Sequence, residues 1–302
     1  MPVLAEASLD LLVTDPQGTY VDVTFGGGGH TRRLLGRLGP DARVFGFDQD
    51  PDAVANAESV QDERLTFVAA NFRHLRRYLR LYGVDEVDGV LADLGVSSHQ
   101  FDEPDRGFSY RYDAPLDMRM SQSDEQPSAA ELLQRTDADA LQAILGEYGE
   151  VRNARTLAHA IVERRETTEL RTTGDLVSLL DQFVRGQRPR YLAQVFQALR
   201  IAVNEEMPAL EDLLSDAQAV MKPGGRLVVI SYHSGEDRLV KNVMKTGRKD
   251  GQHEKDEYGR ITRPWNVVTK KPLEAPAAET LSNPRARSAR LRAAMRNDEK
   301  AK

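Results

Sequence analysis

The sequence has no cysteine, and it has no apolar run close to the ~20 residues that a membrane-spanning helix needs. Without cysteine, disulfides, cysteine-ligated zinc and cysteine nucleophiles are excluded, which fits a reducing compartment. The six histidines are scattered without the spacing of metal ligands, so no metal site is predicted. The first residues, MPVLAEASLDLL, have no basic segment ahead of an apolar stretch and do not predict a signal peptide. We therefore expect a soluble cytoplasmic protein with no membrane partner.

The composition is that of a folded globular protein. The chain has 302 residues, 40% of them hydrophobic, so it can bury either one large core or two smaller ones. The net charge of −6 conceals an asymmetry, because residues 241–302 carry 16 Lys and Arg against 8 Asp and Glu. Such a basic part either contacts phosphates or is a solvated tail, and the composition leaves both open.

Four segments rich in β-branched residues predict strands, and segments with apolar residues at helical spacing separate them. The predicted strands cover residues 19–25, 42–50, 65–72 and 87–95. Short strands that alternate with helices indicate a parallel sheet with crossover helices.

The pattern changes after the fourth strand. Residues 128–185 show only helical periodicity, and residues 193–221 predict a long helical region that Pro208 should break or kink. KPGGRLVVISYHS then returns to a buried strand. We interpret the chain as an α/β domain that is split by an all-helical insert. The predicted boundaries are 1–104 and 192–302 for the α/β domain with its basic C-terminal tail, and 105–191 for the insert.

VDVTFGGGGHT places four glycines between the first strand and a helix. A phosphate-binding loop needs a lysine after its last glycine, but the residues after Gly29 are His30, Thr31 and Arg32. A dinucleotide fingerprint needs its third glycine where this chain has Thr31 or Arg32. An S-adenosylmethionine site is the third interpretation, because glycines let the backbone pass close under the methionine part of that ligand and present amides to its carboxylate.

Residues at the ends of the next three strands fit the same ligand. Asp48 follows the glycines at the distance expected of an acid that accepts hydrogen bonds from both ribose hydroxyls. Phe72, with Asn71 beside it, offers an aromatic face to the adenine. Asp93 points to where either the methyl acceptor or the ammonium group of the ligand would lie, and both roles suit a carboxylate.

Several long strings carry a resemblance to a known family. YVDVTFGGGGHT, DQDP, ADLGVSSHQFDEPDRGFSYRYDAPLDMRM, FQALRIAVNEE, PGGRLVVISYHSGEDRLVK and NPRARSARLR together resemble the bacterial small-subunit ribosomal RNA cytosine-N4 methyltransferase family. The order and spacing match along nearly the whole chain. The resemblance implies a class I, Rossmann-like methyltransferase core with an inserted helical domain. It also implies S-adenosyl-L-methionine as methyl donor and the exocyclic N4 of a cytidine in the decoding region as acceptor.

The resemblance further implies which residues contact the donor. These are Gly28, Gly29, His30, Asp48, Phe72, Asp93 and Gln100. The chain departs from the family pattern at His99, where proline is usual, at Tyr232 and Gly235, where phenylalanine and leucine are usual, and in PRYLAQVFQ. None of these departures is expected to touch the seven donor positions.

Methylation of an exocyclic amino group needs in-line positioning and an acceptor for one N–H. Related amino-methyltransferases carry a D/N-P-P-[YF] motif after the fourth strand, whereas this chain has DLGV there. A stacking surface would then come from elsewhere, with Phe108 or Tyr110 as candidates. Asp93 is the candidate for positioning the acceptor, and no general base is assigned. Asp117 in APLDMRM either pairs with Arg119 in a packed loop or serves the substrate side.

The implied partner is small-subunit ribosomal RNA or the assembling small ribosomal subunit, and the helical insert is expected on its side. The basic tail and four arginines of the insert either grip phosphates or form a solvated face: Arg152, Arg155, Arg164 and Arg165. The sequence leaves the oligomeric state open, a dimer being one alternative. A methyltransferase acting on another nucleic acid and a non-enzymatic RNA-binding protein are the competing hypotheses.

Overall fold

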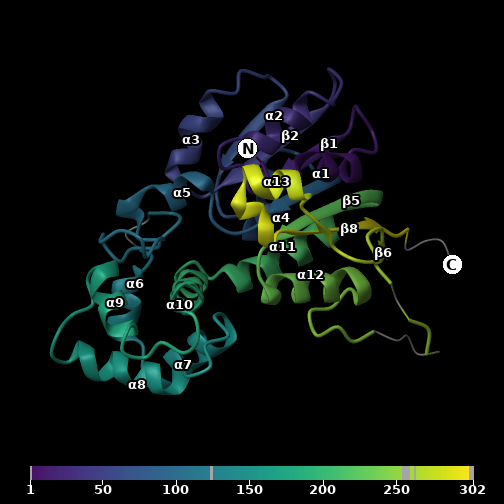
Figure 1. Cartoon of the computed structure of the whole chain (residues 1–302). Helices are drawn as coiled ribbons and strands as arrows, with labels where there is room; N and C mark the ends of the chain where they lie inside the picture. The colour runs from purple at the N-terminus through teal and green to yellow at the C-terminus, as the bar shows by residue number, and fades with distance from the viewer. Residues whose placement is uncertain (1, 123–124, 254–258, 262, 299–302) are drawn as a thin grey trace. The chain divides into compact units, whose positions relative to one another are not determined.

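The chain folds into two compact units. A computed structural model describes residues 2–122, 125–253, 259–261 and 263–298 (Figure 1). The first unit comprises Met1–Gly95 and Met207–Lys302, and the second comprises Val96–Glu206. The second unit is therefore longer at both ends than the predicted insert of residues 105–191.

The first unit is built on an eight-stranded sheet whose strands run in the order β3-β2-β1-β4-β5-β8-β6, with β7 pairing β8. The strands are β1 (Thr19–Asp22), β2 (Arg43–Asp48), β3 (Leu65–Ala69), β4 (Val87–Asp93), β5 (Met221–Ser231), β6 (Trp265–Val267), β7 (Leu273–Glu274) and β8 (Arg290–Arg296). The pairs formed among β1 to β5 are all parallel, and β8 runs antiparallel to β5, β6 and β7. The predicted α/β, Rossmann-like class is confirmed.

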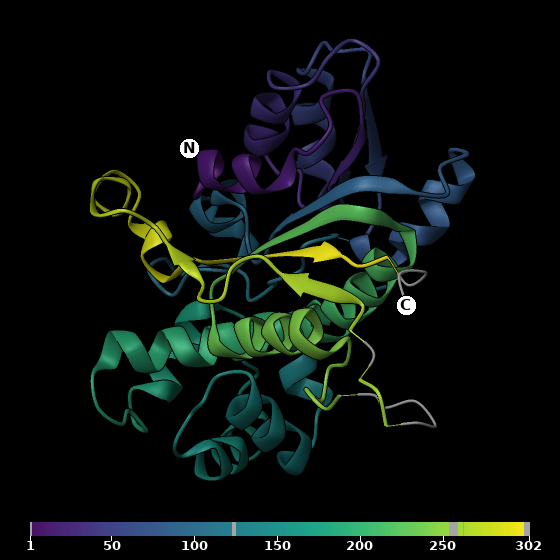
Figure 2. The same cartoon turned by 90° about the vertical axis from the view of Figure 1, so that its right-hand side faces the viewer.

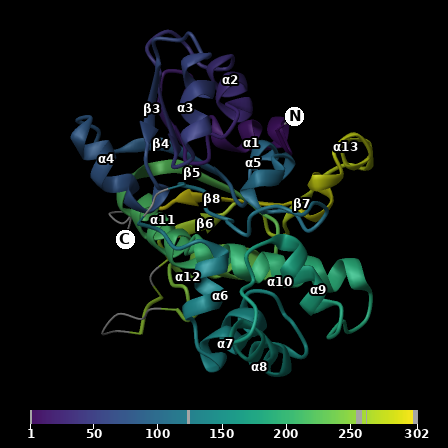
Figure 3. The same ribbon diagram turned by 90° about the vertical axis from the view of Figure 1, so that its left-hand side faces the viewer.

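Helices cover both faces of this sheet, and successive side chains of each strand point to opposite faces. The helices of this unit are α1 (Ala5–Leu12), α2 (Gly29–Leu35), α3 (Pro51–Glu58), α4 (Leu75–Leu81), α11 (Glu206–Val220), α12 (Ser234–Thr246) and α13 (Ala277–Ser282). Tyr20 of β1 packs on the face covered by α1 and α2. Its neighbour Val21 packs on the opposite face with α4, α11 and α12. Figures 2 and 3 show α1 and α2 on one side of the strands and α12 on the other.

Part of the basic C-terminal segment is a strand of the sheet. Its residues Arg290–Arg296 form β8 inside the sheet. Arg292 is buried and donates two hydrogen bonds to Asp237 of α12, at 2.7 Å and 3.1 Å. The arginines concealed the strand because their spacing suggests a solvated face, whereas the alternate residues Leu291 and Ala293 are fully buried.

The described residues of the second unit form helices, a 3-10 turn (Pro104–Arg106) and one isolated bridge between Pro115 and Thr172. The helices are α5 (Ser98–Asp102), α6 (Ala129–Arg135), α7 (Ala138–Glu147), α8 (Ala154–Arg165), α9 (Thr173–Leu180) and α10 (Arg188–Val203). The predicted long helical region divides into α10 and α11 at Asn204, ahead of Pro208, which lies in the first turn of α11. Proline fits there because the first turn has free N–H groups. No helix in the described part of the chain is both long and apolar enough to cross a membrane.

Candidate functional site

Three strands of the first unit end in aspartates at one edge of the sheet. Asp22 closes β1, Asp48 closes β2 and Asp93 closes β4. Because β1 lies between β2 and β4 and all three are parallel, these carboxylates belong to the same edge. The carboxyl edge of an open α/β sheet is where ligands bind.

The glycine turn joins β1 to α2 above this edge. Gly28 precedes α2 with φ of 72°, a left-handed conformation that strains any residue with a Cβ. A Cβ at Gly28 would also lie 2.9 Å from Cζ of Phe25. A Cβ at Gly27 would meet nothing within 4 Å, so the backbone borders open space there. The turn is therefore shaped to let another group approach the main chain.

Asp48 links the end of β2 to this turn. Its Oδ2 accepts a hydrogen bond from the amide of Gly26 at 2.7 Å, and its Oδ1 accepts one from the amide of Asp50 at 2.9 Å. Burial raises the pKa of this carboxyl to about 6, and the two amide hydrogen bonds limit the rise. Asp48 is ionised at neutral pH and presents an acceptor beside the glycines.

His30, the second residue of α2, lies between two of the carboxylates. Its side chain is 5% exposed, and Nε2 lies 3.3 Å from Oδ2 of Asp93. Burial lowers the pKa of His30, but the neighbouring charges of Asp93 and Asp22 outweigh it and raise the pKa above its usual value. Nδ1 of this ring is buried without a hydrogen-bond partner among the described residues. An unpaired buried nitrogen at the edge of the sheet suits a ligand contact.

Asp22 is a site residue that the sequence analysis missed. It is fully buried, its Oδ2 accepts a hydrogen bond from Oγ1 of Thr31 at 2.7 Å, and its Oδ1 accepts one from the amide of Thr24 at 3.2 Å. Burial raises the pKa of this carboxyl. The signal was an acidic residue inside VDV, where a buried strand has no ordinary use for a charge.

Asp93 is held by a second residue that was overlooked. Its Oδ1 accepts a hydrogen bond from the hydroxyl of Tyr232 at 2.6 Å, and its amide donates to Oγ1 of Thr24 at 2.7 Å. Tyr232 is one of the departures from the family pattern. Tyr232 is not itself one of the seven donor positions, but it contacts one of them directly.

Two further predicted donor contacts, Phe72 and Gln100, lie in different units. Phe72 begins the 3-10 turn Phe72–His74 after β3, where it is half-buried. Gln100 lies in α5 of the second unit, where it is buried and its Oε1 accepts a hydrogen bond from the amide of Ser97 at 2.9 Å. The structure thus brings Gly28, Gly29, His30, Asp48, Phe72 and Asp93 to one edge of the first unit and places Gln100 in the other unit.

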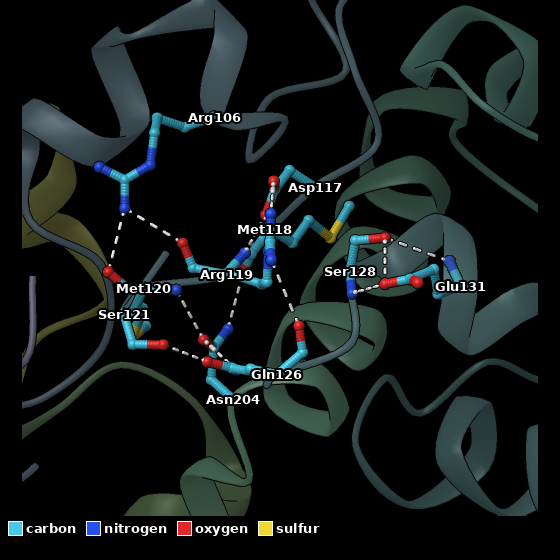
Figure 4. Close-up of polar contacts among 10 residues, drawn as sticks. All are labelled: Arg106, Asp117, Met118, Arg119, Met120, Ser121, Gln126, Ser128, Glu131 and Asn204. Carbon is cyan, nitrogen blue, oxygen red and sulfur yellow. Dashed lines mark hydrogen bonds and ion pairs between the residues drawn. The ribbon is translucent and has the colours of Figure 1, made fainter. Parts of the chain in front are cut away.

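The segment around APLDMRM is a packed loop of the second unit (Figure 4). The buried Asn204 donates to the carbonyl of Met118 at 2.7 Å and accepts from the amide of Met120 at 2.8 Å. Asp117 accepts two hydrogen bonds from the Arg119 guanidinium, both at 2.8 Å. The pairing of Asp117 with Arg119, one of the two interpretations of this loop, is what the structure contains.

The two candidate stacking rings are engaged inside the second unit. Phe108 is buried in the core of that unit, which leaves its ring no free face for a base. Tyr110 packs edge-on against Phe196 and donates a long hydrogen bond to the carbonyl of Pro189 at 3.4 Å. Of the two candidates, Phe108 therefore has its ring covered within the core of its own unit.

The chemistry at the edge of the first unit fits S-adenosylmethionine. The ligand carries a sulfonium and an ammonium, and the partly exposed carboxylate of Asp93 has the complementary charge. The unpaired Nδ1 of His30 and the open space at Gly27 provide a polar contact and room for the ligand. No group of three or more His, Cys, Asp or Glu in the described residues is arranged to hold a metal ion.

A family model and two relatives of similar length agree with this interpretation. A family model described as the MraW methylase family matches residues 1–297. A protein of Cytophaga hutchinsonii named ribosomal RNA small subunit methyltransferase H is 52% identical over 297 residues, which cover 98% of this chain and 99% of that protein. The protein of the same name from Bacteroides thetaiotaomicron is 49% identical, covering 97% of this chain and 96% of that protein. A solved structure of a putative rRNA methylase from Clostridium thermocellum aligns with a TM-score of 0.43 at 16% identity and covers 98% of both chains.

Proposed function

Because the chain belongs to the MraW methylase family, we propose that it transfers a methyl group from S-adenosylmethionine to the exocyclic N4 of a cytidine in small-subunit ribosomal RNA. Similarity over nearly the full length of both relatives supports the assignment of the whole activity rather than of a shared domain. An RNA acceptor of this kind places the protein in the cytoplasm with the ribosome.

The observation that carries the proposal is the arrangement of charged groups around the glycine turn. Asp48 is anchored by the amide of Gly26, and His30 lies against Asp93 across the same edge. In this arrangement Asp48 would accept hydrogen bonds from the ribose hydroxyls, and the open backbone at Gly27 would leave room for the methionine part of the ligand. Phe72 would cover the adenine. These residues would orient the donor and exclude water from it.

When bound, S-adenosylmethionine supplies a methyl group activated by its sulfonium, and the amino nitrogen that accepts the methyl loses one proton. Asp93 provides a fixed negative charge beside the reacting groups, since its two oxygens and its amide all have partners. Asp22 does not contact solvent, so its part is to hold Thr24 and Thr31 and to balance the charge of His30.

We place the RNA against the second unit, as part of this proposal. Arg152, Arg155 and Arg164 lie exposed on or beside α8, where their charges can meet phosphates. Arg165 has a different use, because its guanidinium donates to the carbonyls of Leu133 and Thr136 at the end of α6.

The experiment incubates the purified protein with labelled S-adenosylmethionine and either naked small-subunit RNA or small subunits from a strain that lacks the enzyme. Mass spectrometry of the nucleosides should show N4-methylated cytidine from one of the two substrates. Methylation of DNA alone, or RNA binding without turnover, would contradict the proposal in favour of the competing hypotheses. Asp48→Ala should abolish donor binding, whereas Asp10→Ala, which removes an exposed acid paired with Arg37, should leave it unchanged.

A further inference from the structure

Tyr232 is the residue that follows β5, and its ring reaches the neighbouring strand. Ile230 of β5 pairs with Asp93 of β4 in the parallel register. The hydroxyl of Tyr232 donates a hydrogen bond to Oδ1 of Asp93 at 2.6 Å. A hydrogen bond of this length to a carboxylate is charge-assisted and stronger than one between neutral groups.

Three contacts hold Asp93 in place. Tyr232 holds Oδ1, His30 lies 3.3 Å from Oδ2, and the Asp93 amide donates to Oγ1 of Thr24 at 2.7 Å. The side chain nevertheless keeps 21% of its surface exposed. The carboxylate therefore has a fixed orientation and still offers part of its surface to a ligand.

Tyr232 is itself fixed in place. Its amide donates to Oε2 of Glu236 at 2.8 Å, and Glu236 closes the capping box at the start of α12. Burial, followed by the neighbouring charge of Asp93, raises the pKa of the Tyr232 phenol far above its usual value. The phenol therefore stays protonated around neutral pH, and it acts as a hydrogen-bond donor to Asp93 without transferring its proton.

We propose that Tyr232 is a positioning residue for the methyl donor, acting only through Asp93, whose carboxylate it holds in the orientation that meets the positive charge of the donor. The inference rests on the proposed function for the identity of the donor and the reaction. A carboxylate that is oriented before the ligand arrives loses less freedom on binding, and its charge is already aligned when the methyl group moves.

The first test is Tyr232→Phe, which removes a single oxygen. Donor affinity should fall roughly 10- to 100-fold, the usual worth of a hydrogen bond to a charged group. KM for the RNA should not change. The matched control is Tyr20→Phe, because the hydroxyl of Tyr20 is bonded only to the loop at Thr14 and Asp15, beyond the opposite end of β1. This control should leave both donor affinity and kcat as in the wild type.

The second test is a double-mutant cycle with Asp93→Ala, measured as the dissociation constant of S-adenosylmethionine by calorimetry. If Tyr232 acts only through Asp93, then Tyr232→Phe should have no further effect once Asp93 is alanine. Additive effects, or wild-type donor binding by Tyr232→Phe alone, would overturn the inference. The cycle needs no RNA, so it gives its answer even if the wild-type protein binds the donor and fails to methylate small-subunit RNA, an outcome that would refute the proposed function instead.

Discussion

Donor binding should weaken as the pH falls through about 6, because Asp48 must be ionised to serve the ribose. Burial raises the pKa of Asp48 to about 6, so the carboxyl is charged at neutral pH and neutral in mild acid. The ionised form can accept from both ribose hydroxyls, whereas the protonated form has turned one oxygen into a donor. The affinity is therefore fully present well above pH ~6 and is lost as the pH falls through that value.

The size of the effect follows from the same pKa. At about pH 5, one pH unit below a pKa of about 6, roughly one molecule in eleven has Asp48 ionised, so the dissociation constant should rise about tenfold, or about 1.4 kcal/mol. Between about pH 7 and 8 it should scarcely change on account of this group. Calorimetric titration with S-adenosylmethionine at about pH 5 and about pH 8 measures the ratio of the two dissociation constants directly.

Other groups at the site also titrate, so the measurement needs a variant that lacks only the Asp48 charge. Asp48→Asn keeps the size of the side chain and should bind the donor weakly. The pH responses of His30 and Asp22 are common to both proteins, so the ratio between wild type and variant isolates Asp48. If the wild type and Asp48→Asn lose affinity in parallel as the pH falls, the reasoning is refuted.

Three further predictions concern residues that shape the two units. Arg292→Ala leaves Asp237 buried with only Arg290 nearby, at 3.5 Å, and should lower the free energy of unfolding in urea by about 3 kcal/mol; a loss below about 1 kcal/mol would contradict the pairing. Asn204→Ala removes the partners of the Met118 carbonyl and the Met120 amide and should cost about 2–4 kcal/mol by the same measurement. Gly28→Ala should weaken donor binding at least about tenfold through backbone strain, whereas Gly36→Ala, at φ −67° just after the other end of α2, should bind the donor normally.

The parts of the fold that the sequence predicted are those set by local pattern. Runs of β-branched residues located β1 to β5, although the observed strands end two or three residues earlier than expected at β1 to β4. The glycine turn could be predicted because consecutive glycines between a strand and a helix indicate a close approach of the backbone to a ligand. Asp48 was found because its distance from the glycines is fixed by one strand–helix–strand unit.

The parts that were missed depend on contacts between distant segments. β8 carries arginines whose partner, Asp237, lies 55 residues away, so nothing local marks Arg292 as buried. Tyr232 reaches Asp93 across 139 residues, a contact that exists only once β5 has paired with β4. Asp22 differs, because an acid inside an apolar strand can be recognised from the sequence alone.

The insertion point of the second unit has a consequence for how the sheet forms. β4 and β5 are hydrogen-bonded neighbours in the sheet, but the whole helical unit lies between them in the sequence. Bringing Asp93 and Tyr232 together across 139 residues of disordered chain costs about 4 kcal/mol of chain entropy. A helical unit with its own core forms from local contacts and shortens that segment before the strands meet. Mutations that slow the folding of the helices should therefore delay the appearance of donor binding in refolding experiments, even though Asp48 and Asp93 lie in the other unit.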